Sequence, residues 1–290
     1  MTQLGSVLRE ARQQLCAALP LELNVAALEA QILLAYALNK PRAFLLASPT
    51  AELNKLDLSL FENLLQRRLS GVPIAYILGK REFYGFEFCV TPDVLIPRPE
   101  TELLVELALA YIPEQQPIQI LDLGTGSGAI ALSLAKLRPY AQVTAVDISP
   151  KALLVAQQNA DKLALSNVHF LESDWFNALN PAQPFDLIIA NPPYVAKNDP
   201  HLRQGDVQFE PLIALTSGAD GLDDIRHIAR AAPAFLSPNG LLLIEHGYNQ
   251  QDTIIALLLS LDFAAVTGHR DLADVARVTS GKKSRNMMNQ

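Results

Sequence analysis

The chain has 290 residues, of which half are hydrophobic and 18% are charged, and its formal net charge at pH 7 is -7. This composition excludes a disordered or fibrous protein and predicts a large globular domain, alone or joined to a small one. The acidic balance is unfavourable for gripping long stretches of nucleic acid, and two cysteines are too few for a disulfide framework or a cysteine-rich metal site. The N-terminus lacks the apolar core of a signal peptide, and no uninterrupted apolar run is long enough to span a membrane. We therefore expect a cytoplasmic protein without a metal.

The first 79 residues show the spacing of amphipathic helices. Apolar residues recur at three- and four-residue steps, as one buried helix face requires. The three stretches are Leu4, Val7, Leu8, Ala11 and Leu15; Val25, Leu28, Ile32, Leu33 and Tyr36; and Phe61, Leu64, Leu65 and Leu69. Asn24 is a candidate N-cap of the second helix. Residues 1–79 are predicted to form a small helical domain that carries no recognisable chemistry of its own.

The pattern changes over residues 80–98. Aromatic and β-branched residues around Gly85 predict a β-hairpin, and the prolines that follow predict an extended linker. Pro99, with acidic residues at positions 100 and 102, is typical of the first turn of a helix, which we expect to end near Tyr111.

Strands and helices then alternate within residues 99–290. The predicted strands are 118–123, 142–147, 168–171, 187–190, 241–245, 264–267 and 275–279, and the predicted helices between or after them are 129–137, 150–163, 222–235 and 252–261. Such alternation predicts an α/β domain, with a mostly parallel sheet that is covered by helices on both faces.

A glycine-rich turn follows the first of these strands. Residues 120–128 read Ile-Leu-Asp-Leu-Gly-Thr-Gly-Ser-Gly, and the candidate ligand-binding residues are Gly124, Thr125, Gly126, Ser127 and Gly128. Glycines allow the sharp turn and let a ligand lie against bare main chain. The turn also satisfies a dinucleotide fingerprint, but it is not a P-loop because no Gly-Lys-Ser/Thr follows.

Carboxylates follow the next two strands. Asp147 ends the second strand, where a carboxylate can accept hydrogen bonds from both hydroxyls of a ribose. The alternative for Asp147 is an acid at the start of the next helix. Asp174 and Trp175 follow the third strand, where they can bind and stack on an adenine. The alternative for Trp175 is packing in the core.

The fourth strand ends in Asn191-Pro192-Pro193-Tyr194. Open α/β sheets bind ligands at this end of their strands. The two prolines make the corner rigid, Asn191 and the carbonyl of Pro192 offer two acceptors, and Tyr194 offers an aromatic face. A planar –NH2 group fits between these acceptors. The alternative is a proline turn with a structural role only.

In this order and spacing, these motifs resemble the class I methyltransferases that use S-adenosylmethionine to modify planar nitrogens. The Asn-Pro-Pro-Tyr motif is shared by amino-adenine, exocyclic-guanine and glutamine-amide methyltransferases, so it indicates the chemistry and not the substrate. Three further segments narrow the choice: residues 73–79, 83–85 and the Ile-Pro-Arg-Pro-Glu-Thr-Glu run at 96–102. With the helical N-terminal region, they resemble the release factor glutamine methyltransferases over nearly the whole chain.

This resemblance implies a seven-stranded, mostly parallel Rossmann-like methyltransferase sheet with a small N-terminal helical-bundle domain. It implies S-adenosylmethionine as cofactor, bound by the glycine turn with Asp147, Asp174, Trp175 and Asn191. The implied substrate is the glutamine of the Gly-Gly-Gln loop in bacterial class I peptide chain release factors, which would become N5-methylglutamine. Residues 1–79 are implied to help dock that partner.

The catalytic residues implied are Asn191, Pro192 and Tyr194. Asn191 and the carbonyl of Pro192 would bind both amide hydrogens and favour the pyramidal nitrogen of the transition state. The substrate-binding residues implied are Asn191, Pro192, Pro193, Tyr194, Arg98 and Glu100. For Arg98 and Glu100 the alternatives are helix-start electrostatics and a salt bridge. Glu245-His246 is a candidate general base, and an ordinary strand end is its alternative.

Three other functions compete with this interpretation. A methyltransferase acting on N6 of adenine or N2 of guanine in nucleic acid shares the Asn-Pro-Pro-Tyr motif, but it predicts a basic groove and a flipped base. The net charge argues against it, whereas Arg67, Arg68 and the lysines near the C-terminus argue for it. A nicotinamide-dependent dehydrogenase or a catalytically silent adaptor leaves Asn-Pro-Pro-Tyr unexplained. We expect no direct binding of nucleic acid and no membrane association.

Overall fold

The computed structural model describes residues 2–284, and the chain divides into two compact units. The first unit runs through Lys80 and also includes Pro200–Phe209, while the second contains Arg81–Asp199 and the residues from Glu210 onward. The sequence pattern does not predict that Pro200–Phe209 joins the helical unit, because nothing local marks a segment that packs on a distant part of the chain. Its two short 3-10 turns are η2 (Pro200–Arg203) and η3 (Gly205–Phe209).

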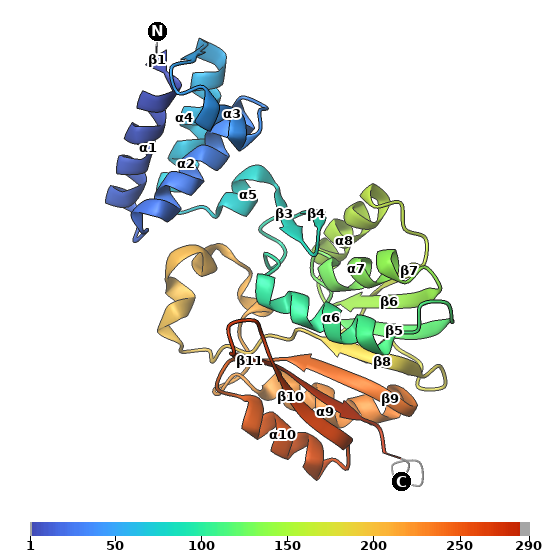
Figure 1. Ribbon diagram of the computed structural model, residues 1–290. Coiled ribbons are helices and arrows are strands. Elements are labelled where there is room, and N and C mark those ends of the chain that lie inside the picture. The colour runs from blue at the N-terminus through green and yellow to red at the C-terminus, as the bar shows by residue number, and fades with distance from the viewer. Residues whose placement is uncertain (1, 285–290) are drawn as a thin grey trace. The chain divides into compact units, whose positions relative to one another are not determined.

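Helices build the core of the first unit, as predicted (Figure 1). They are α1 (Leu4–Ala18), α2 (Leu23–Ala37), α3 (Arg42–Ala47), α4 (Lys55–Leu69) and α5 (Ile74–Leu78). A short antiparallel pair, β1 (Thr2–Gln3) with β2 (Glu52–Leu53), accompanies them. The apolar stripes predicted for α1 and α4 supply most of their buried faces.

The face predicted for the second helix is mostly wrong, because Leu33 is the only one of its five residues that is buried. Three residues expected to be buried are exposed: Val25, Leu28 and Tyr36. The buried face instead carries Ala26, Ala30, Leu33, Leu34 and Ala37. Alanines on this face let α2 approach its neighbours closely, which a pattern built on large side chains does not reveal. Asn24 is not the N-cap either, because α2 begins at Leu23 with Glu22 in the capping position.

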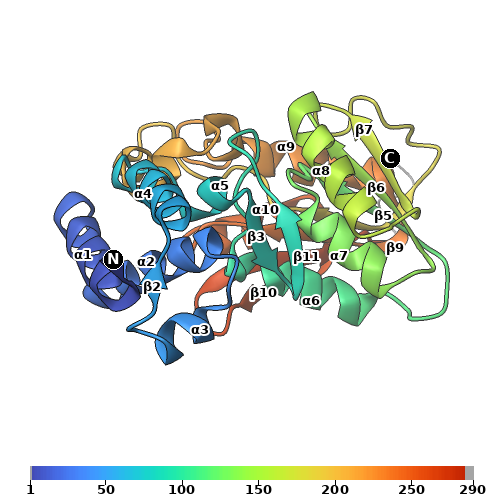
Figure 2. The same cartoon turned by 90° about the horizontal axis from the view of Figure 1, so that it is seen from above.

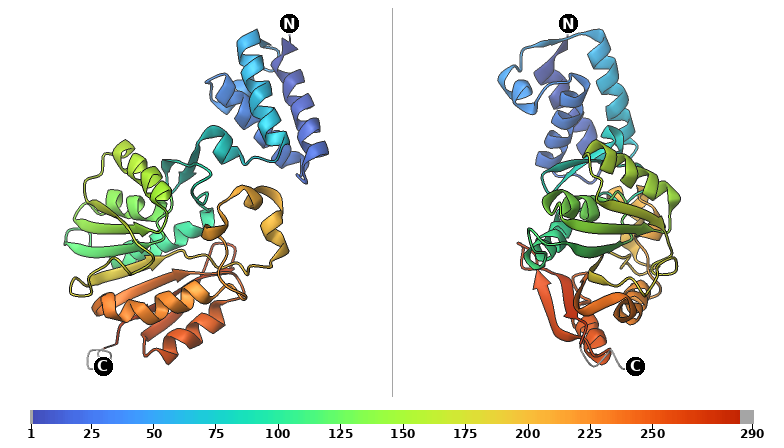
Figure 3. Two further views of the ribbon diagram at one scale, coloured as in Figure 1. Left: turned by 180° about the vertical axis from the view of Figure 1, so that it is seen from behind. Right: turned by 90° about the vertical axis from the view of Figure 1, so that its right-hand side faces the viewer.

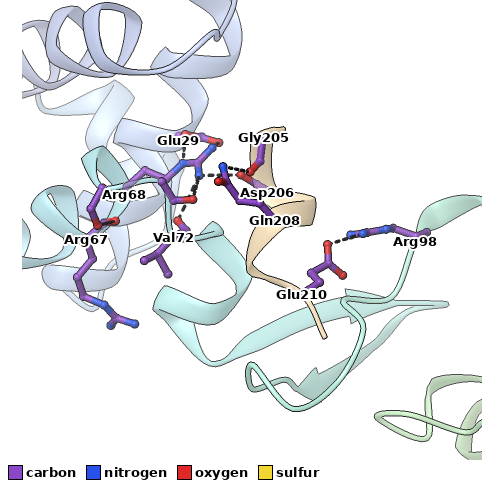
Figure 4. Close-up of polar contacts among 11 residues, drawn as sticks. Glu29, Arg67, Arg68, Val72, Arg98, Gly205, Asp206, Gln208 and Glu210 are labelled. Carbon is purple, nitrogen blue, oxygen red and sulfur yellow. Dashed lines mark hydrogen bonds and ion pairs between the residues drawn. The ribbon is translucent and has the colours of Figure 1, made fainter. Parts of the chain in front are cut away.

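A buried arginine holds Pro200–Phe209 against the helices of the first unit. Arg68 on α4 is only 3% exposed. Its Nε donates to Oε2 of Glu29 at 2.8 Å, and its Nη1 donates to Oδ1 of Asp206 at 2.8 Å (Figure 4). Gly71 faces Phe209, and a Cβ at Gly71 would lie 2.9 Å from that ring. A buried guanidinium needs such paired carboxylates to offset the loss of its hydration.

The segment before the sheet forms the predicted hairpin from β3 (Lys80–Phe83) and β4 (Phe86–Cys89). Both residues of its turn, Tyr84 and Gly85, have positive φ, which matches the twist of a two-residue hairpin. The turn η1 (Pro99–Thr101) and helix α6 (Glu102–Tyr111) follow, again as predicted.

The hairpin lies beside α8 (Pro150–Lys162), as Figure 2 also shows. The Asn159 side chain on α8 accepts the Cys89 N–H at 2.6 Å and donates to the Cys89 carbonyl at 3.0 Å. The carboxamide thus satisfies backbone groups at the end of β4.

A seven-stranded sheet forms the centre of the second unit and confirms the predicted fold class. Its strands are β5 (Ile118–Leu123), β6 (Ala141–Asp147), β7 (Val168–Glu172), β8 (Phe185–Ala190), β9 (Leu236–Glu245), β10 (Ala264–Arg270) and β11 (Ala276–Lys282). The order is β10-β11-β9-β8-β5-β6-β7, with β11 antiparallel to both neighbours and the other pairs parallel. Between β5 and β8 the strand order reverses, and open sheets bind ligands at such a point.

Helices cover both faces of this sheet (Figures 1 and 3). The helices α6, α7 (Ala129–Leu137) and α8 share one core, and α9 (Asp223–Phe235) and α10 (Gln251–Ser260) share the other. Successive residues of β8 alternate between these cores: Leu187 and Ile189 belong to the first, Ile188 and Ala190 to the second. The part of β8 that is buried on both faces, residues 187–190, is therefore continuously apolar, and the charged Asp186 lies at the other end of the strand. None of the helices within residues 2–284 has the length and apolar character needed to cross a membrane.

Candidate active site

A cavity of about 240 Å³ lies within the second unit, at the carboxyl ends of the central strands. Its volume is of the order found for small-molecule sites. Seven of the predicted site residues line it: Gly124, Gly126, Asp147, Asp174, Trp175, Asn191 and Pro193. They follow β5, β6, β7 and β8, so the sheet gathers four separate segments at the point where its strand order reverses.

The glycine turn presents main chain to this cavity. Gly124 and Gly126 have φ values of 71° and 56°, in the left-handed region that favours glycine. At Gly126 nothing lies within 4 Å of the position a Cβ would take, so the space beside it is open. The second glycine of the motif thus leaves the room that a closely approaching ligand requires, whereas the Cβ position of the first faces the ring of Trp175.

The other three residues of the turn do not line the cavity. Their contacts are with other parts of the fold. Thr125 is buried, and its Oγ1 donates to Oδ2 of Asp122 at 2.6 Å. The Ser127 carbonyl accepts a hydrogen bond from Asn159. Gly128 caps α7, and a Cβ there would come within 2.9 Å of Leu132. Its role is close packing of the helix.

Asp147 organises the turn as well as lining the cavity. Its Oδ2 accepts the Gly126 N–H at 2.8 Å, and its Oδ1 accepts the Ser149 N–H at 2.9 Å. Burial raises the pKa of Asp147, and these two hydrogen bonds offset only part of the increase. Ser149, and not Asp147, is the N-cap of α8, since its side chain accepts the Ala152 N–H. Each carboxylate oxygen keeps acceptor capacity for a hydroxyl of a bound ligand.

Trp175 both lines the cavity and packs against the core around α9. Its φ of 48° is uncommon for a bulky residue. The indole lies against Gly124, and Nε1 donates to Oδ1 of Asp224 at 3.2 Å. Asp224 therefore fixes the ring, and nothing in the sequence pattern marked it. Asp174 is exposed at the cavity wall.

The Asn-Pro-Pro-Tyr corner follows β8. Nδ2 of Asn191 donates to Oγ1 of Thr101 at 3.2 Å. Pro193 lines the cavity, while Pro192 is buried and is not among the lining residues. The Tyr194 hydroxyl lies 3.4 Å from Oε1 of Glu245 and donates to it, and burial raises the pKa of this phenol.

Thr101 and Glu245 are the buried polar partners of this corner, with exposed fractions of 4% and 1%. Burial raises the pKa of Glu245 to about 7, while hydrogen bonding from Thr101 and the charge of Arg277 oppose the increase. Its Oε2 has no hydrogen-bond partner. In the sequence, Glu245 is marked only as a carboxylate that ends the apolar run 241–244, and Thr101 only by its place in the run at 96–102.

A second buried carboxylate lies under the glycine turn. Burial raises the pKa of Asp122 to about 6, partly offset by hydrogen bonds from Thr125 and the backbone of Ala131. Its Oδ1 has no hydrogen-bond partner.

Arg98 and Glu100 are not among the residues lining the cavity. Arg98 pairs with the buried carboxylate of Glu210, which also accepts the Ile96 N–H at 3.1 Å (Figure 4). The structure thus shows the salt bridge that the sequence left as an alternative for Arg98. Pro211, next to Glu210, lines the cavity, so the ion pair supports one of its walls.

Within the described part of the chain, no group of three or more His, Cys, Asp or Glu side chains is placed so that it could hold a metal ion.

Known protein families and individual proteins match residues in both units of the chain. A family model described as "PrmC N-terminal domain" matches residues 6–79, and one described as "Methyltransferase domain" matches residues 115–289. The chain is 49% identical over 261 residues to the release factor glutamine methyltransferase of Burkholderia pseudomallei, covering 88% of this chain and 92% of that protein. It is 44% identical over 277 residues to the release factor glutamine methyltransferase of Shewanella oneidensis, covering 96% of both.

Among solved structures, a methyltransferase from Pyrococcus furiosus superposes with a TM-score of 0.54 at 17% identity, covering 77% of this chain and 99% of that one. At this identity the likeness concerns the fold alone.

Proposed function

The chain belongs to the release factor glutamine methyltransferase family, and we propose that it transfers a methyl group from S-adenosylmethionine to the side-chain amide nitrogen of a glutamine in bacterial class I release factors. The observation that carries this proposal is the position of Asn191: it follows β8 and lines the same cavity as Gly126 and Asp147. A group that can bind a planar amide therefore adjoins groups that can bind a nucleoside.

The residues of the cavity fit the methyl donor. Gly126 leaves an open cradle that a Cβ would fill, and Asp147 presents a carboxylate held by two backbone amides. Trp175 supplies an aromatic surface, and Asp174 an acceptor at the wall. When bound, S-adenosylmethionine supplies a methyl group on a positively charged sulfur.

An amide nitrogen is a weak nucleophile, so positioning is the main contribution we assign to the protein. Since Nδ2 of Asn191 is engaged with Thr101, Oδ1 is the atom left to accept a hydrogen bond from the substrate –NH2 group. The carbonyl of Pro192 is the proposed second acceptor. Two acceptors aimed at the nitrogen favour the partial positive charge that develops on it.

Tyr194 is the proposed third contact of the substrate. Its hydroxyl is held by Glu245, which fixes the ring beside the amide or the sulfonium, where an aromatic face favours positive charge. Arg98 is proposed to act on the substrate indirectly, through Glu210 and the wall that follows it. Glu100 has no contact that supports a direct role.

We infer that residues 1–79 help to dock the release factor, and that the reaction takes place in the cytoplasm, where translation factors act. Two exposed leucines on α4, Leu56 and Leu60, are one helical turn apart and give this domain an apolar surface. Such a surface suits a protein partner.

The test is transfer of labelled methyl from S-adenosylmethionine to a purified release factor. A Gln→Ala variant of its Gly-Gly-Gln loop and bulk RNA serve as parallel acceptors. Label on the wild-type factor alone supports the proposal. Label on RNA alone contradicts it and supports a nucleic-acid methyltransferase instead.

A further inference from the structure

The Asn-Pro-Pro-Tyr corner rests on a polar cluster buried beneath it. Asn191 contacts Thr101 through Nδ2, and Tyr194 contacts Glu245 through its hydroxyl. The hydroxyl of Thr101 lies near enough to Glu245 to lower the pKa of that carboxyl by hydrogen bonding, against the larger effect of burial. The cluster joins η1, the corner after β8 and the end of β9, all within the second unit.

The chemistry of these groups fixes the direction of each hydrogen bond. An ionised carboxylate only accepts, so Glu245 requires the Thr101 hydroxyl to donate to it. The Thr101 oxygen is then left as an acceptor for Nδ2 of Asn191. The two ends of an asparagine amide are nearly equal in shape, so this bond decides whether oxygen or nitrogen faces the cavity.

We propose that Glu245 is a positioning residue that acts through Thr101 to hold Asn191 with its side-chain oxygen toward the substrate amide. With the opposite orientation, Asn191 would present an –NH2 group to the –NH2 group it has to bind. This inference rests on the proposed function, because it assigns how that substrate nitrogen is held.

The groups that face Glu245 are consistent with an ionised carboxylate in the active enzyme. Arg277 on β11 and the hydroxyls of Thr101 and Tyr194 favour the charged form, while Glu100 on η1 and burial disfavour it. Burying a carboxylate costs stability, and its Oε2 lacks a partner. Such a cost in stability is expected at a functional site, where the charge of Glu245 would hold a substrate-binding side chain in place.

Three substitutions test the direction of these bonds. Glu245→Gln keeps the shape of the side chain but adds an –NH2 donor. Thr101 can then accept from residue 245 and donate to Asn191, so the Asn191 amide can adopt the opposite orientation. Thr101→Val keeps the side-chain volume and removes the hydroxyl that lies between Glu245 and Asn191. Thr101→Ser keeps that hydroxyl. We expect the first two to lower kcat about 10- to 100-fold, because misplacing a reacting group typically costs this much. Thr101→Ser should stay within about 3-fold of wild type, and the dissociation constant of S-adenosylmethionine should change little in all three.

The matched control is Thr279→Val, which removes another buried hydroxyl from the sheet, one that bonds to His246. It should lower the melting temperature without lowering kcat. The kcat of wild type should also fall as the pH drops below about 7, because protonated Glu245 can donate to Thr101. Glu245→Gln should lack this pH dependence.

A readout independent of turnover separates this inference from the proposed function. Nδ2 of Asn191 gives an NMR signal that can be identified by its loss in Asn191→Ala. Slow hydrogen exchange at this –NH2 in wild type, and faster exchange in Thr101→Val, support the orientation even if release factor proves not to be the acceptor. Wild-type turnover in Glu245→Gln, or equal exchange in wild type and Thr101→Val, would overturn it.

Discussion

The carboxylate of Asp147 and the backbone N–H of Gly126 form a 2.8 Å hydrogen bond that joins the ends of two parallel strands. The residue expected to bind a ribose therefore also holds the turn expected to face the rest of the cofactor. A second backbone amide, that of Ser149, donates to the same carboxylate. Cofactor affinity and local stability are consequently coupled at this residue.

Asp147→Ala should weaken S-adenosylmethionine binding by roughly 10- to 100-fold, since hydrogen bonds to a charged group contribute about 1.5–3 kcal/mol each. It should also lower the melting temperature, because two amides lose their acceptor. Asp186→Ala is the matched control: Asp186 also accepts a backbone N–H, from Gln119, but at the opposite end of the strands. Calorimetry should show unchanged cofactor affinity in the control, and an unchanged affinity in Asp147→Ala would contradict the assignment.

Asn191→Ala removes the acceptor proposed for the substrate amide. By analogy with the loss of one preorganised polar group, turnover should fall on the order of 100-fold or more. The measurement is single-turnover methyl transfer at saturating cofactor, which separates the chemical step from binding. If the variant turns over normally, the proposed mechanism is wrong.

Arg98 and Glu210 should behave as one energetic unit. Arg98→Met leaves the buried Glu210 carboxylate without its cation, whereas Glu210→Gln removes the charge and keeps the shape. In a double-mutant cycle, the unfolding free energies should show a coupling of about 1–3 kcal/mol. Additive effects, within about 0.5 kcal/mol, would mean that the pair contributes nothing as a pair.

Arg68→Met should release Pro200–Phe209 from the helices of the first unit. The substitution leaves Glu29 and Asp206 without their shared cation, so local opening becomes more frequent. Limited proteolysis with mass spectrometry should show faster cleavage within this segment. Arg67→Met is the control, since Arg67 is also in the last turn of α4 but reaches only two backbone carbonyls, at 3.4 Å. Equal cleavage in both variants would refute the anchoring role.

Glu245 should make stability depend on pH. Its folded-state pKa of about 7 lies above the ordinary value of 4.5, so folding favours the protonated form. Its contribution to stability is complete below about pH 4.5 and is lost as the pH rises through 7. Relative to Glu245→Gln, wild type should lose on the order of 3 kcal/mol between these limits. Thermal unfolding of both proteins at pH 5 and pH 8 measures this, and a constant difference would contradict it.

Local sequence predicted the order and type of the main elements of the second unit, because hydrophobic period and turn residues are local properties. It did not predict all of their bounds, since β9 begins at Leu236 and not at residue 241, and β10 continues to Arg270. The strand Ile118–Leu123 and the helix Ala129–Leu137 have the predicted bounds, and the glycine turn lies between them. The corner at Asn191 was also marked locally, by two prolines after an apolar strand. These signals need no knowledge of distant residues.

Only the tertiary structure decided which distant groups meet these motifs. Thr101 lies 90 positions from Asn191, and Asp206 lies 138 positions from Arg68. The buried face of α2 was likewise set by how closely its alanines let neighbouring helices approach. Periodicity describes one element at a time, whereas burial, ion pairing and hydrogen-bond direction depend on what the folded chain places opposite each side chain.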